Sequence, residues 1–319
     1  MFQPVPQNNR MAVGLMVIFT VFLAGTTLLA KAIGTGVFGP PLHPLQVSWG
    51  RFLFAFVAIS AIFAQRGEPI RHPAWTLHFG RSFCGWGGVS LTFASVAYIP
   101  LSDATAISFL SPVFAMLLAI PILGETVGRV RWGAAGIALV GMVILLRPGP
   151  ESFQPAAMLA LAAAVAMGIE MIFIKRLSGR EPWRQILLVN NTIGVSVATL
   201  AMLPVWQAPT AAQWAALAGI GVIMLSAQVC FVNAMARAEA SLVAPFSYGT
   251  LVFAALYDLM FFGVLPDTVS ILGAAVIVAG AALLAWREAM RRSDNAAAAN
   301  DAESAGPLAS APSVTSIED

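Results

Sequence analysis

The stretch SPVFAMLLAIPILG (Ser111–Gly124) returns later in the chain in altered form, as TLVFAALYDLMFFG (Thr250–Gly263). The two stretches align without a gap at an offset of 139 residues, and both end in glycine. The similarity continues beyond them, because the tripeptide GAA at Gly133 returns at Gly273 after a one-residue shift. Apolar helices can resemble one another by chance, but a likeness half a chain apart favours two copies of one structural unit.

The composition indicates a protein that is embedded in a membrane. Of the 319 residues, 59% are hydrophobic and 10% are charged, and the mean hydropathy is +0.82. Soluble domains carry about 25% charged residues, so this chain has too few polar side chains to cover a surface in water. A net charge of +2 gives no reason to expect a nucleic-acid partner. We therefore predict an integral membrane protein that is surrounded by the lipid bilayer.

Apolar runs between turn signals predict ten membrane-spanning helices. A helix needs about 20 apolar residues to cross the hydrocarbon core, and these runs are too long and too uniformly apolar for the alternating strands of a β-barrel. The predicted spans cover residues 12–33, 44–64, 79–99, 103–122, 130–147, 156–175, 185–206, 212–235, 241–263 and 268–287.

The basic residues fit this number of spans and indicate an orientation. With ten spans both termini lie on one side, and if that side is the cytoplasm, 14 of the 17 Lys and Arg residues lie in cytoplasmic segments. Lys31 and Arg147 then lie outside, and Arg51 lies within a span. The positive-inside rule describes such a distribution. We predict a multi-pass protein of the inner (plasma) membrane with both termini in the cytoplasm.

The two ends of the chain each need a separate interpretation. Arg10, the apolar run after it and the sequence AKA at residues 30–32 also resemble a signal peptide, whose cleavage would leave nine spans. The run is longer than a usual signal core, so we expect an uncleaved helix. Residues 291–319 are small, polar and acidic, which predicts a disordered cytoplasmic tail.

An odd number of spans in each half predicts that the halves are inverted. Residues 1–149 and 150–290 each hold five predicted spans, so the second unit enters the membrane in the opposite direction. Arg129 follows the fourth span, whereas the loop after the ninth span has no Lys or Arg, which agrees. Inverted repeats are typical of transporters with a binding site near the midplane. We expect an all-α integral membrane fold of ten transmembrane helices in two inverted five-helix repeats.

One long run resembles a known family. The run PLSDATAISFLSPVFAMLLAIPILGETVGRVRWGAAGIALVGMVILLRPG (Pro100–Gly149) resembles the EamA-like branch of the drug/metabolite transporter superfamily, as do Arg51-Phe52 and FFGVLPD at Phe261–Asp267. The resemblance covers the ten spans and excludes the tail. It implies carriage of a small metabolite, such as an amino acid derivative or a nucleoside-like or vitamin-like compound. It also implies that helices 1–4 and 6–9 surround a cavity, with helices 5 and 10 as scaffold or homodimer contact.

The resemblance has one departure and one finer feature. The second half has Gly263-Val264 where the first has Gly124-Glu125, so a role for a glutamate at this turn carries over to Glu125 alone. Lys31, in the sequence LLAKAIG, and the FG-x-LPD turn are similar to the subgroup that contains riboflavin and S-adenosylmethionine carriers.

Four charged residues within the spans or at their edges are candidates for substrate binding: Lys31, Arg51, Glu170 and Asp258. A charge inside a bilayer costs roughly 2.5–3.5 kcal/mol on insertion scales, so each must face a cavity or a partner. Arg51 offers a planar fork of donors to an anionic group, and the alternative is a salt bridge to Glu170 or Asp258. Asp258 corresponds to an apolar residue in the first unit, so it is a candidate substrate or proton group. Interface positions are the alternatives for Glu170 and Lys31.

Uncharged polar side chains within the spans or at their ends form a second set of candidates, because buried hydroxyls and amides need partners. Such groups contact either the substrate or a neighbouring helix. Trp86 is expected in the cavity or in the aromatic belt at the membrane surface. The polar candidates are Tyr98, Ser111, Asn190, Gln228, Asn233 and Tyr248.

The motifs favour a secondary carrier over other classes of membrane protein. Two cysteines and three histidines without neighbouring ligands predict no metal site, and no cofactor is expected. Neither lysine follows glycine in a phosphate-binding loop, which argues against an ATP-driven pump. The chain has no H-E-x-x-H or G-x-S-x-G motif, although an intramembrane enzyme or a lipid-handling protein remains the alternative. We expect alternating-access transport of a small polar metabolite, with no catalytic residues.

Overall fold

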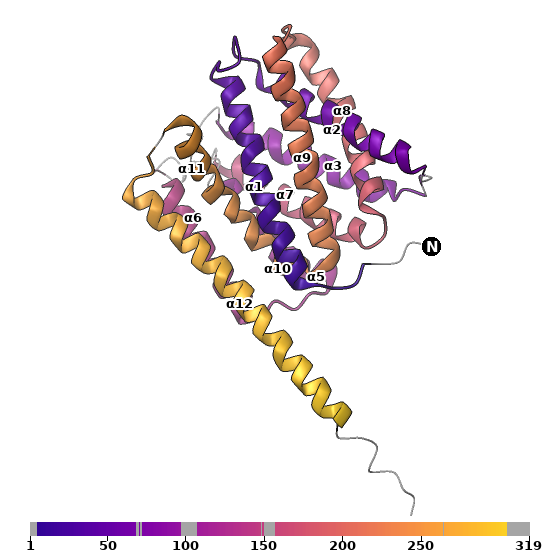
Figure 1. Cartoon of the computed structure of the whole chain (residues 1–319), viewed down its shortest axis with the longest axis vertical. Coiled ribbons are helices and arrows are strands. Elements are labelled where there is room, and N and C mark those ends of the chain that lie inside the picture. Colours follow the sequence, from indigo (N-terminus) through magenta and orange to yellow (C-terminus); the bar gives the residue numbers. More distant parts are fainter. Residues whose placement is uncertain are drawn as a thin grey trace, which may run out of the picture.

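The chain folds into a bundle of helices (Figure 1). The computed structural model describes residues 5–67, 70, 72–96, 107–147, 149, 157–263 and 265–304, without the side chains of residues 93, 94, 96 and 288–304. All of the regular elements in this part of the chain are helices.

The helices fall into a first and a second group along the chain. The first group contains α1 (Asn9–Gly34), α2 (Pro44–Arg66), α3 (Trp75–Val96), α5 (Ser111–Leu123) and α6 (Arg129–Leu146). The second group contains α7 (Ala157–Ser178), α8 (Trp183–Met202), η2 (Leu203–Val205), α9 (Ala211–Arg237), α10 (Ala240–Val243), η3 (Ala244–Tyr248), α11 (Gly249–Phe262) and α12 (Thr268–Ser304).

Within the described residues, eight helical segments are long and apolar enough to cross a membrane. The other two predicted spans correspond to α3, which is not among the eight and contains Arg81, and to α5, which has 13 residues. Large apolar side chains cover the outside of the bundle; those of Phe83, Leu200 and Met260 are between 72% and 75% exposed. An all-helical membrane fold is therefore confirmed, and the count of ten spans stays a prediction.

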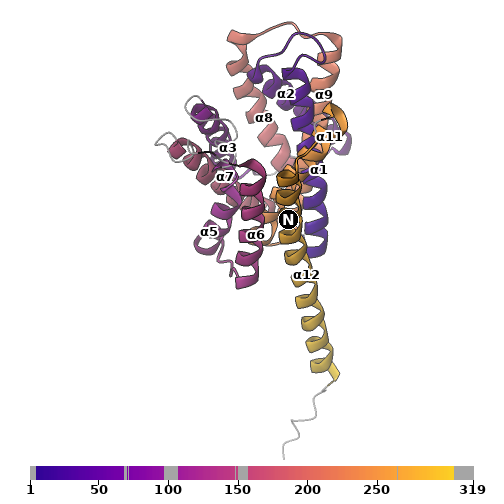
Figure 2. The same cartoon turned by 90° about the vertical axis from the view of Figure 1, so that its left-hand side faces the viewer.

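Two predicted segments differ from the structure in their extent. The span predicted over residues 241–263 is interrupted, because α10 is followed by the 3-10 helix η3, which contains Pro245, before α11 begins. Proline lacks an amide hydrogen and cannot continue the helical hydrogen bonds. The helix α12 also continues from Thr268 to Ser304 and so extends into the first part of the segment for which a disordered tail is predicted (Figure 2). The run of four alanines at 296–299 has a high helix propensity, which explains the extension.

The most extensive contacts pair a helix of the first group with one of the second. α6 packs along α12, α1 along α9, α3 along α7 and α2 along α8 (Figures 1 and 2). These neighbours are antiparallel, since the N–H of Asn8 before α1 donates to Arg237 at the end of α9 at 2.8 Å. Likewise, the N–H of Ala74 before α3 donates to Glu181, which follows α7, at 2.6 Å.

The turns that follow α5 and α11 lie at opposite ends of the bundle (Figure 1). After α5, Glu125 accepts the N–H of Ala240, close to the start of α1. In the last turns of α11, Asp258 contacts Lys31, in the last turn of α1. The glycines that align in the sequence both end a helix in the left-handed conformation, Gly124 with φ of 69° and Gly263 with φ of 65°.

The α6–α12 pair packs through glycine at a very short interhelical distance. A Cβ atom on Gly141 would lie 2.7 Å from the backbone nitrogen of Ile277 and 2.8 Å from the carbonyl oxygen of Gly273. At the end of this pair, outside the spans, Arg147 donates hydrogen bonds to Asp267 and holds the pKa of that carboxyl well below its usual range. The two helices therefore form one unit along the side of the bundle.

Candidate functional site

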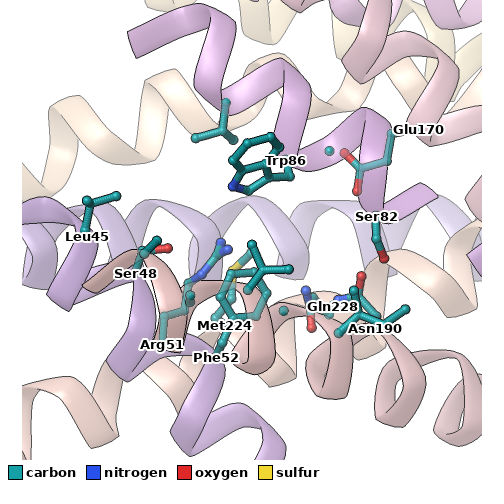
Figure 3. Close-up of a pocket in the computed structure, with 17 residues that line it drawn as sticks. Leu45, Ser48, Arg51, Phe52, Ser82, Trp86, Glu170, Asn190, Met224 and Gln228 are labelled. Carbon is teal, nitrogen blue, oxygen red and sulfur yellow. The ribbon is translucent and has the colours of Figure 1, made fainter. Parts of the chain in front are cut away.

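A cavity of about 250 Å³ lies between α2, α3, α7, α8 and α9 (Figure 3). Helices from both groups thus form its walls. Its polar lining comes from a cation, a carboxylate, two amides and two hydroxyls, and Trp86 contributes a large aromatic face. These polar residues are Ser48, Arg51, Ser82, Glu170, Asn190 and Gln228.

Arg51 is the cationic residue in the lining of this cavity. Its guanidinium lies over the ring of Phe52, with 4.2 Å between the guanidinium carbon and the ring centroid. Within the part of the chain that the structure describes, no carboxylate lies within 4 Å of it. The predicted alternative, a salt bridge from Arg51 to Glu170 or Asp258, is therefore not formed, and the guanidinium points into the cavity beside Trp86 (Figure 3).

Glu170 pairs with a different arginine. Arg81, which is 3% exposed, places its Nε 3.9 Å from the Oε1 of Glu170. Gly85 provides the space for this carboxylate, because a Cβ atom at that position would lie 2.9 Å from the carboxyl atoms. The side chain of Glu170 is 29% exposed and lines the cavity. It faces the cavity and Arg81, so the membrane-interface position that was its alternative does not describe this structure.

The amides of Asn190 and Gln228 lie together on the wall of the cavity that α8 and α9 form (Figure 3). Gln228 Oε1 accepts a hydrogen bond from Asn191 Nδ2 at 3.3 Å, which orients this side chain toward the lining. The face of α8 that borders the cavity continues with Gly194 and Ala198. Gly194 leaves room for the ring of Phe52, because a Cβ atom at this position would clash with that ring.

Lys31 and Asp258 pair with each other and lie outside the lining of this cavity. Lys31 Nζ donates to Asp258 Oδ1 at 2.6 Å and also lies 4.6 Å from the centroid of the Phe262 ring. The pair joins the ends of α1 and α11. The structure thus separates the four charged candidates into two places.

The remaining polar candidates are dispersed. Ser111 is the first residue of α5. Asn233 donates to the carbonyl of Val229 and accepts from Arg237, at 2.8 and 2.7 Å, so its bonds stay within α9. Tyr248 is fully buried, and its hydroxyl has no hydrogen-bond partner among the described residues. Tyr98 lies outside the described residues.

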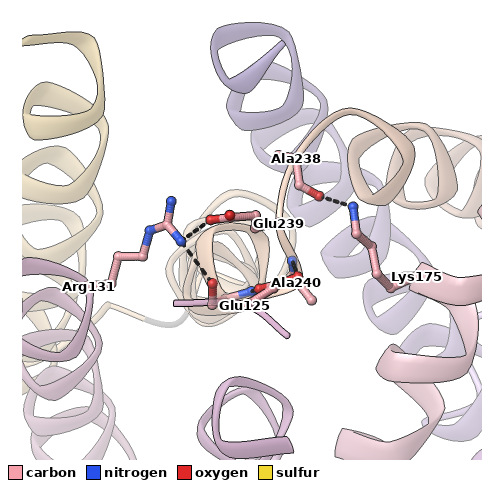
Figure 4. A network of polar contacts seen from close by, with 7 residues as sticks. Glu125, Arg131, Lys175, Ala238, Glu239 and Ala240 are labelled. Carbon is pink, nitrogen blue, oxygen red and sulfur yellow. Dashed lines mark hydrogen bonds and ion pairs between the residues drawn. The ribbon is translucent and has the colours of Figure 1, made fainter. Parts of the chain in front are cut away.

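A network of charges surrounds the break between α9 and α10 (Figure 4). The Glu125 carboxylate accepts the N–H groups of Ala240 and Ser241 at 2.7 and 2.9 Å, at the start of α10. Lys175 Nζ donates to the carbonyls of Met235, at 2.7 Å, and Ala238, at the end of α9. An anion at a helix start and a cation at a helix end both complement the helix dipole. These groups therefore stabilise both sides of the break.

Arg131 links the same break to α6. Its guanidinium donates to the carboxylate of Glu239 and, at 3.0 Å, to the hydroxyl of Ser241 (Figure 4). Several residues that the sequence assigned to cytoplasmic segments thus contact backbone and carboxylate groups at helix ends. Arg81 differs from them, because it lies inside α3.

A second capping carboxylate lies outside the spans, between α7 and α8. Glu181 accepts the Ala74 N–H at 2.6 Å and Gln185 Nε2 at 2.8 Å, and it lies 2.9 Å from His78 Nε2. Burial by itself raises the pKa of Glu181, but the hydrogen bonds from His78 and Ala74 outweigh it, so the pKa lies below its ordinary value. Within the described residues, no three His, Cys, Asp or Glu side chains are placed to hold a metal ion.

Sequence reasoning missed Arg81 and left Trp86 open between the cavity, where it lies, and the aromatic belt. Both lie on the face of α3 that carries Ser82, Gly85 and Val89. Small and polar residues at spacings of three and four along this helix are a signal that could have identified the face. Arg81 was assigned to a cytoplasmic segment because it lies near the edge of its predicted span.

Comparisons with known proteins identify the family. The model of the EamA-like transporter family matches residues 10–147 and again residues 154–286. An S-adenosylmethionine uptake transporter of Rickettsia bellii is 24% identical over 283 residues, which cover 88% of this chain and 96% of the relative. A riboflavin transporter of Vibrio cholerae is 30% identical over 219 residues, which cover 68% and 74%.

Two further matches extend this picture. A pseudopaline exporter of Pseudomonas aeruginosa is 30% identical over 192 residues, which cover 58% of this chain and 66% of the exporter. A protein of known crystal structure shares the fold with a TM-score of 0.71 at 22% identity, over 85% of this chain and 96% of that one. With its apolar helices and its two family matches, the chain is a multi-pass membrane transporter that belongs to the EamA-like transporter family.

Proposed function

We propose that the protein is a secondary carrier that moves a small polar metabolite across the inner membrane by alternating access of two inverted repeats. The observation that carries this proposal is the polar cavity between helices of both halves, with a cation directed into it. The named relatives carry S-adenosylmethionine, riboflavin and pseudopaline. Two groups of relatives are described as uptake or general transporters and one as an exporter, so the direction of transport is left open.

The pairing of helices supports two repeats related by a two-fold axis, with residues 1–149 and 150–290 as the units. In chain order, the counterparts of α1, α2, α3, α5 and α6 are α7, α8, α9, α11 and α12. Exchanging each helix for its counterpart converts the α1–α9 pair into the α7–α3 pair. The same exchange converts α5–α7 into α11–α1, and it maps α2–α8 and α6–α12 onto themselves. A two-fold relation between inverted halves is the architecture on which alternating access operates.

The positions of the turns support the inversion and an orientation. The turn after α5 lies at the end of the bundle where α1 begins, and the turn after α11 lies at the other end (Figure 1). The first of these ends holds Arg131, Lys175, Arg176 and Arg237. Basic residues gather on the cytoplasmic side, so we place this end, and the start of α1, in the cytoplasm.

Transport in sealed proteoliposomes tests the carrier function. We expect counterflow or gradient-driven accumulation of at least one compound in a panel that includes S-adenosylmethionine, riboflavin and small organic acids, amines and amino acids. Arg51→Gln should abolish it while the protein stays folded. If no compound crosses in either direction, with or without a proton gradient, the proposal is rejected.

Accessibility labelling tests the inversion separately. In a chain whose Cys84 and Cys230 are replaced by serine, the variants Thr126→Cys and Leu265→Cys place single thiols in the exposed turns after α5 and α11. We expect an impermeant reagent to label them from opposite sides of the membrane. Labelling from one shared side contradicts the inverted arrangement.

A further inference from the structure

The cavity and its surroundings carry an uneven set of charges. Within the described part of the chain, Arg51 and Glu170 line the cavity, and Arg81 pairs with Glu170 behind it. Two guanidinium groups therefore face one carboxylate, which leaves one positive charge without a carboxylate partner among the described residues. An uncompensated charge at membrane depth is costly, so a molecule that binds here gains most if it brings one negative charge.

The geometry determines which of the two arginines is left over. Glu170 lies 3.9 Å from Arg81 and within electrostatic range of Arg51, but it has no contact with Arg51 shorter than 4 Å. Arg81 is 3% exposed and therefore lies behind the wall of the cavity. Gly85, one turn along α3, leaves the space that the Glu170 carboxylate occupies beside Arg81.

Arg51 has the access to the cavity that Arg81 lacks, because Arg51 lines the cavity and Arg81 does not. Its guanidinium lines the cavity between Ser48 and Phe52 and points toward the open space below Trp86 (Figure 3). A guanidinium binds a carboxylate through two parallel hydrogen bonds. The rings of Phe52 and Trp86 border the same space and provide a surface for a flat, apolar body.

We propose that Arg81 is a positioning residue: it holds Glu170 away from Arg51, and Arg51 thereby binds the anionic group of a small organic acid with a planar body. This inference rests on the proposed carrier function and specifies its substrate class. If Arg81 were absent, Glu170 would neutralise Arg51, and the cavity would lose its preference for an anion. If Glu170 were removed as well, the preference would return.

Binding to the purified full chain in lipid nanodiscs tests the inference. Indole-3-acetate and indole-3-acetamide have the same planar body, but the acid alone is charged. We expect the wild-type protein to bind the acid at least about tenfold more tightly than the amide, as a charge-assisted bond allows. The preference should fall to near unity in Arg51→Gln and in Arg81→Gln, and it should return in Arg81→Gln/Glu170→Gln.

The recovery in the double variant separates positioning from a general structural role. If Arg81 only supported the fold, removing its partner Glu170 as well would not restore the preference for the acid. Arg81→Lys, which keeps the charge, should keep most of the preference. If Arg81→Gln does not fold, the double variant carries the test, since it lacks the buried pair and keeps Arg51. Loss of the acid preference in the double variant, or its persistence in Arg81→Gln, overturns the proposal.

The outcomes also separate this inference from the carrier function. Equal binding of acid and amide, together with transport of a neutral or cationic compound in proteoliposomes, rejects the organic acid and leaves the carrier function intact. The expected pattern of acid preference without any transport rejects the carrier function and supports the assignment of Arg51 and Arg81.

Discussion

Lys31 donates a hydrogen bond to Asp258 at 2.6 Å, although 227 residues separate them in the chain. The contact joins α1 to α11, and each side chain remains more than a third exposed. Lys31 and Asp258 were both candidates for substrate binding, and in the structure they bind each other. Because both side chains remain partly exposed, the contribution of the pair to stability is modest, and its effect should appear in the movement of α1 against α11.

The first prediction concerns this ion pair. Asp258→Asn should reduce transport several-fold, because Lys31 loses its partner, while the melting temperature changes little. The exchange Lys31→Asp/Asp258→Lys should recover most of the transport, since it restores the pair in reverse. Initial rates in proteoliposomes provide the measurement. An exchange variant as inactive as Asp258→Asn would instead indicate that the carboxylate at position 258 is itself required.

The second prediction concerns the cap at the start of α10. Glu125 is 8% exposed and accepts two backbone N–H groups. Glu125→Gln places an amide group toward these donors, so we expect a loss of about 1–3 kcal/mol, visible as a lower melting temperature in detergent. Glu239→Gln is the comparison, because the Glu239 side chain is 44% exposed and does not cap the helix. Equal losses in both variants would contradict the capping role.

The third prediction concerns the close packing of α6 and α12. Gly141→Ala introduces a methyl group 2.7 Å from the backbone of α12, which should cost about 1–3 kcal/mol because backbone atoms cannot move aside easily. Gly136→Ala in the same helix meets no atom within 4 Å and should be neutral or stabilising by up to about 1 kcal/mol. Thermal unfolding of both variants in one detergent measures the difference; no difference would show that the helices can separate freely.

The fourth prediction concerns the space beside Glu170. Gly85→Ala would place a Cβ atom 2.9 Å from the carboxyl of Glu170, so the carboxylate must leave its position beside Arg81. We expect the preference for indole-3-acetate over indole-3-acetamide to fall several-fold. Gly87→Ala, two residues along, meets nothing within 4 Å and should keep the wild-type preference. An unchanged preference in Gly85→Ala would indicate that Glu170 does not control Arg51 from this position.

The fifth prediction concerns pH. The pKa of Glu181 lies below its ordinary value of 4.5 in the folded chain, so its hydrogen bonds stabilise the fold fully above that value. This stabilisation is lost as the pH falls through the lowered pKa. The melting temperature of the wild type should therefore exceed that of Glu181→Gln from neutral pH down to about pH 4.5, and the two should converge below it. A difference that persists unchanged in stronger acid would assign the effect to packing.

The extent of most helices could be predicted from the sequence, because an apolar run between turn signals determines where a helix crosses a membrane. The aligned glycines Gly124 and Gly263 do end their helices in the left-handed conformation. The predictions were less accurate where local chemistry conflicts with the apolar pattern. Pro245 interrupts a span, and alanines continue α12 into the polar tail.

The candidate site was predicted only in part. The rule that a polar group within the membrane must face a cavity or a partner identified Arg51, Glu170 and Gln228, and all three line the cavity. The same rule identified Asp258, whose partner is Lys31. The rule could not distinguish the residues that line the cavity from those that form this pair. Arg81 was missed because its position near a span edge gives no indication of its burial.

The chain by itself determined that this protein lies in a membrane, where most of its helices lie along the sequence, and that one unit occurs twice, because these properties depend on local composition and on similarity along the chain. Only the tertiary structure decided which charges meet. Whether Glu170 neutralises Arg51 or Arg81 depends on differences of a few ångström between helices that are far apart in the chain, and these distances are determined by side-chain packing between helices.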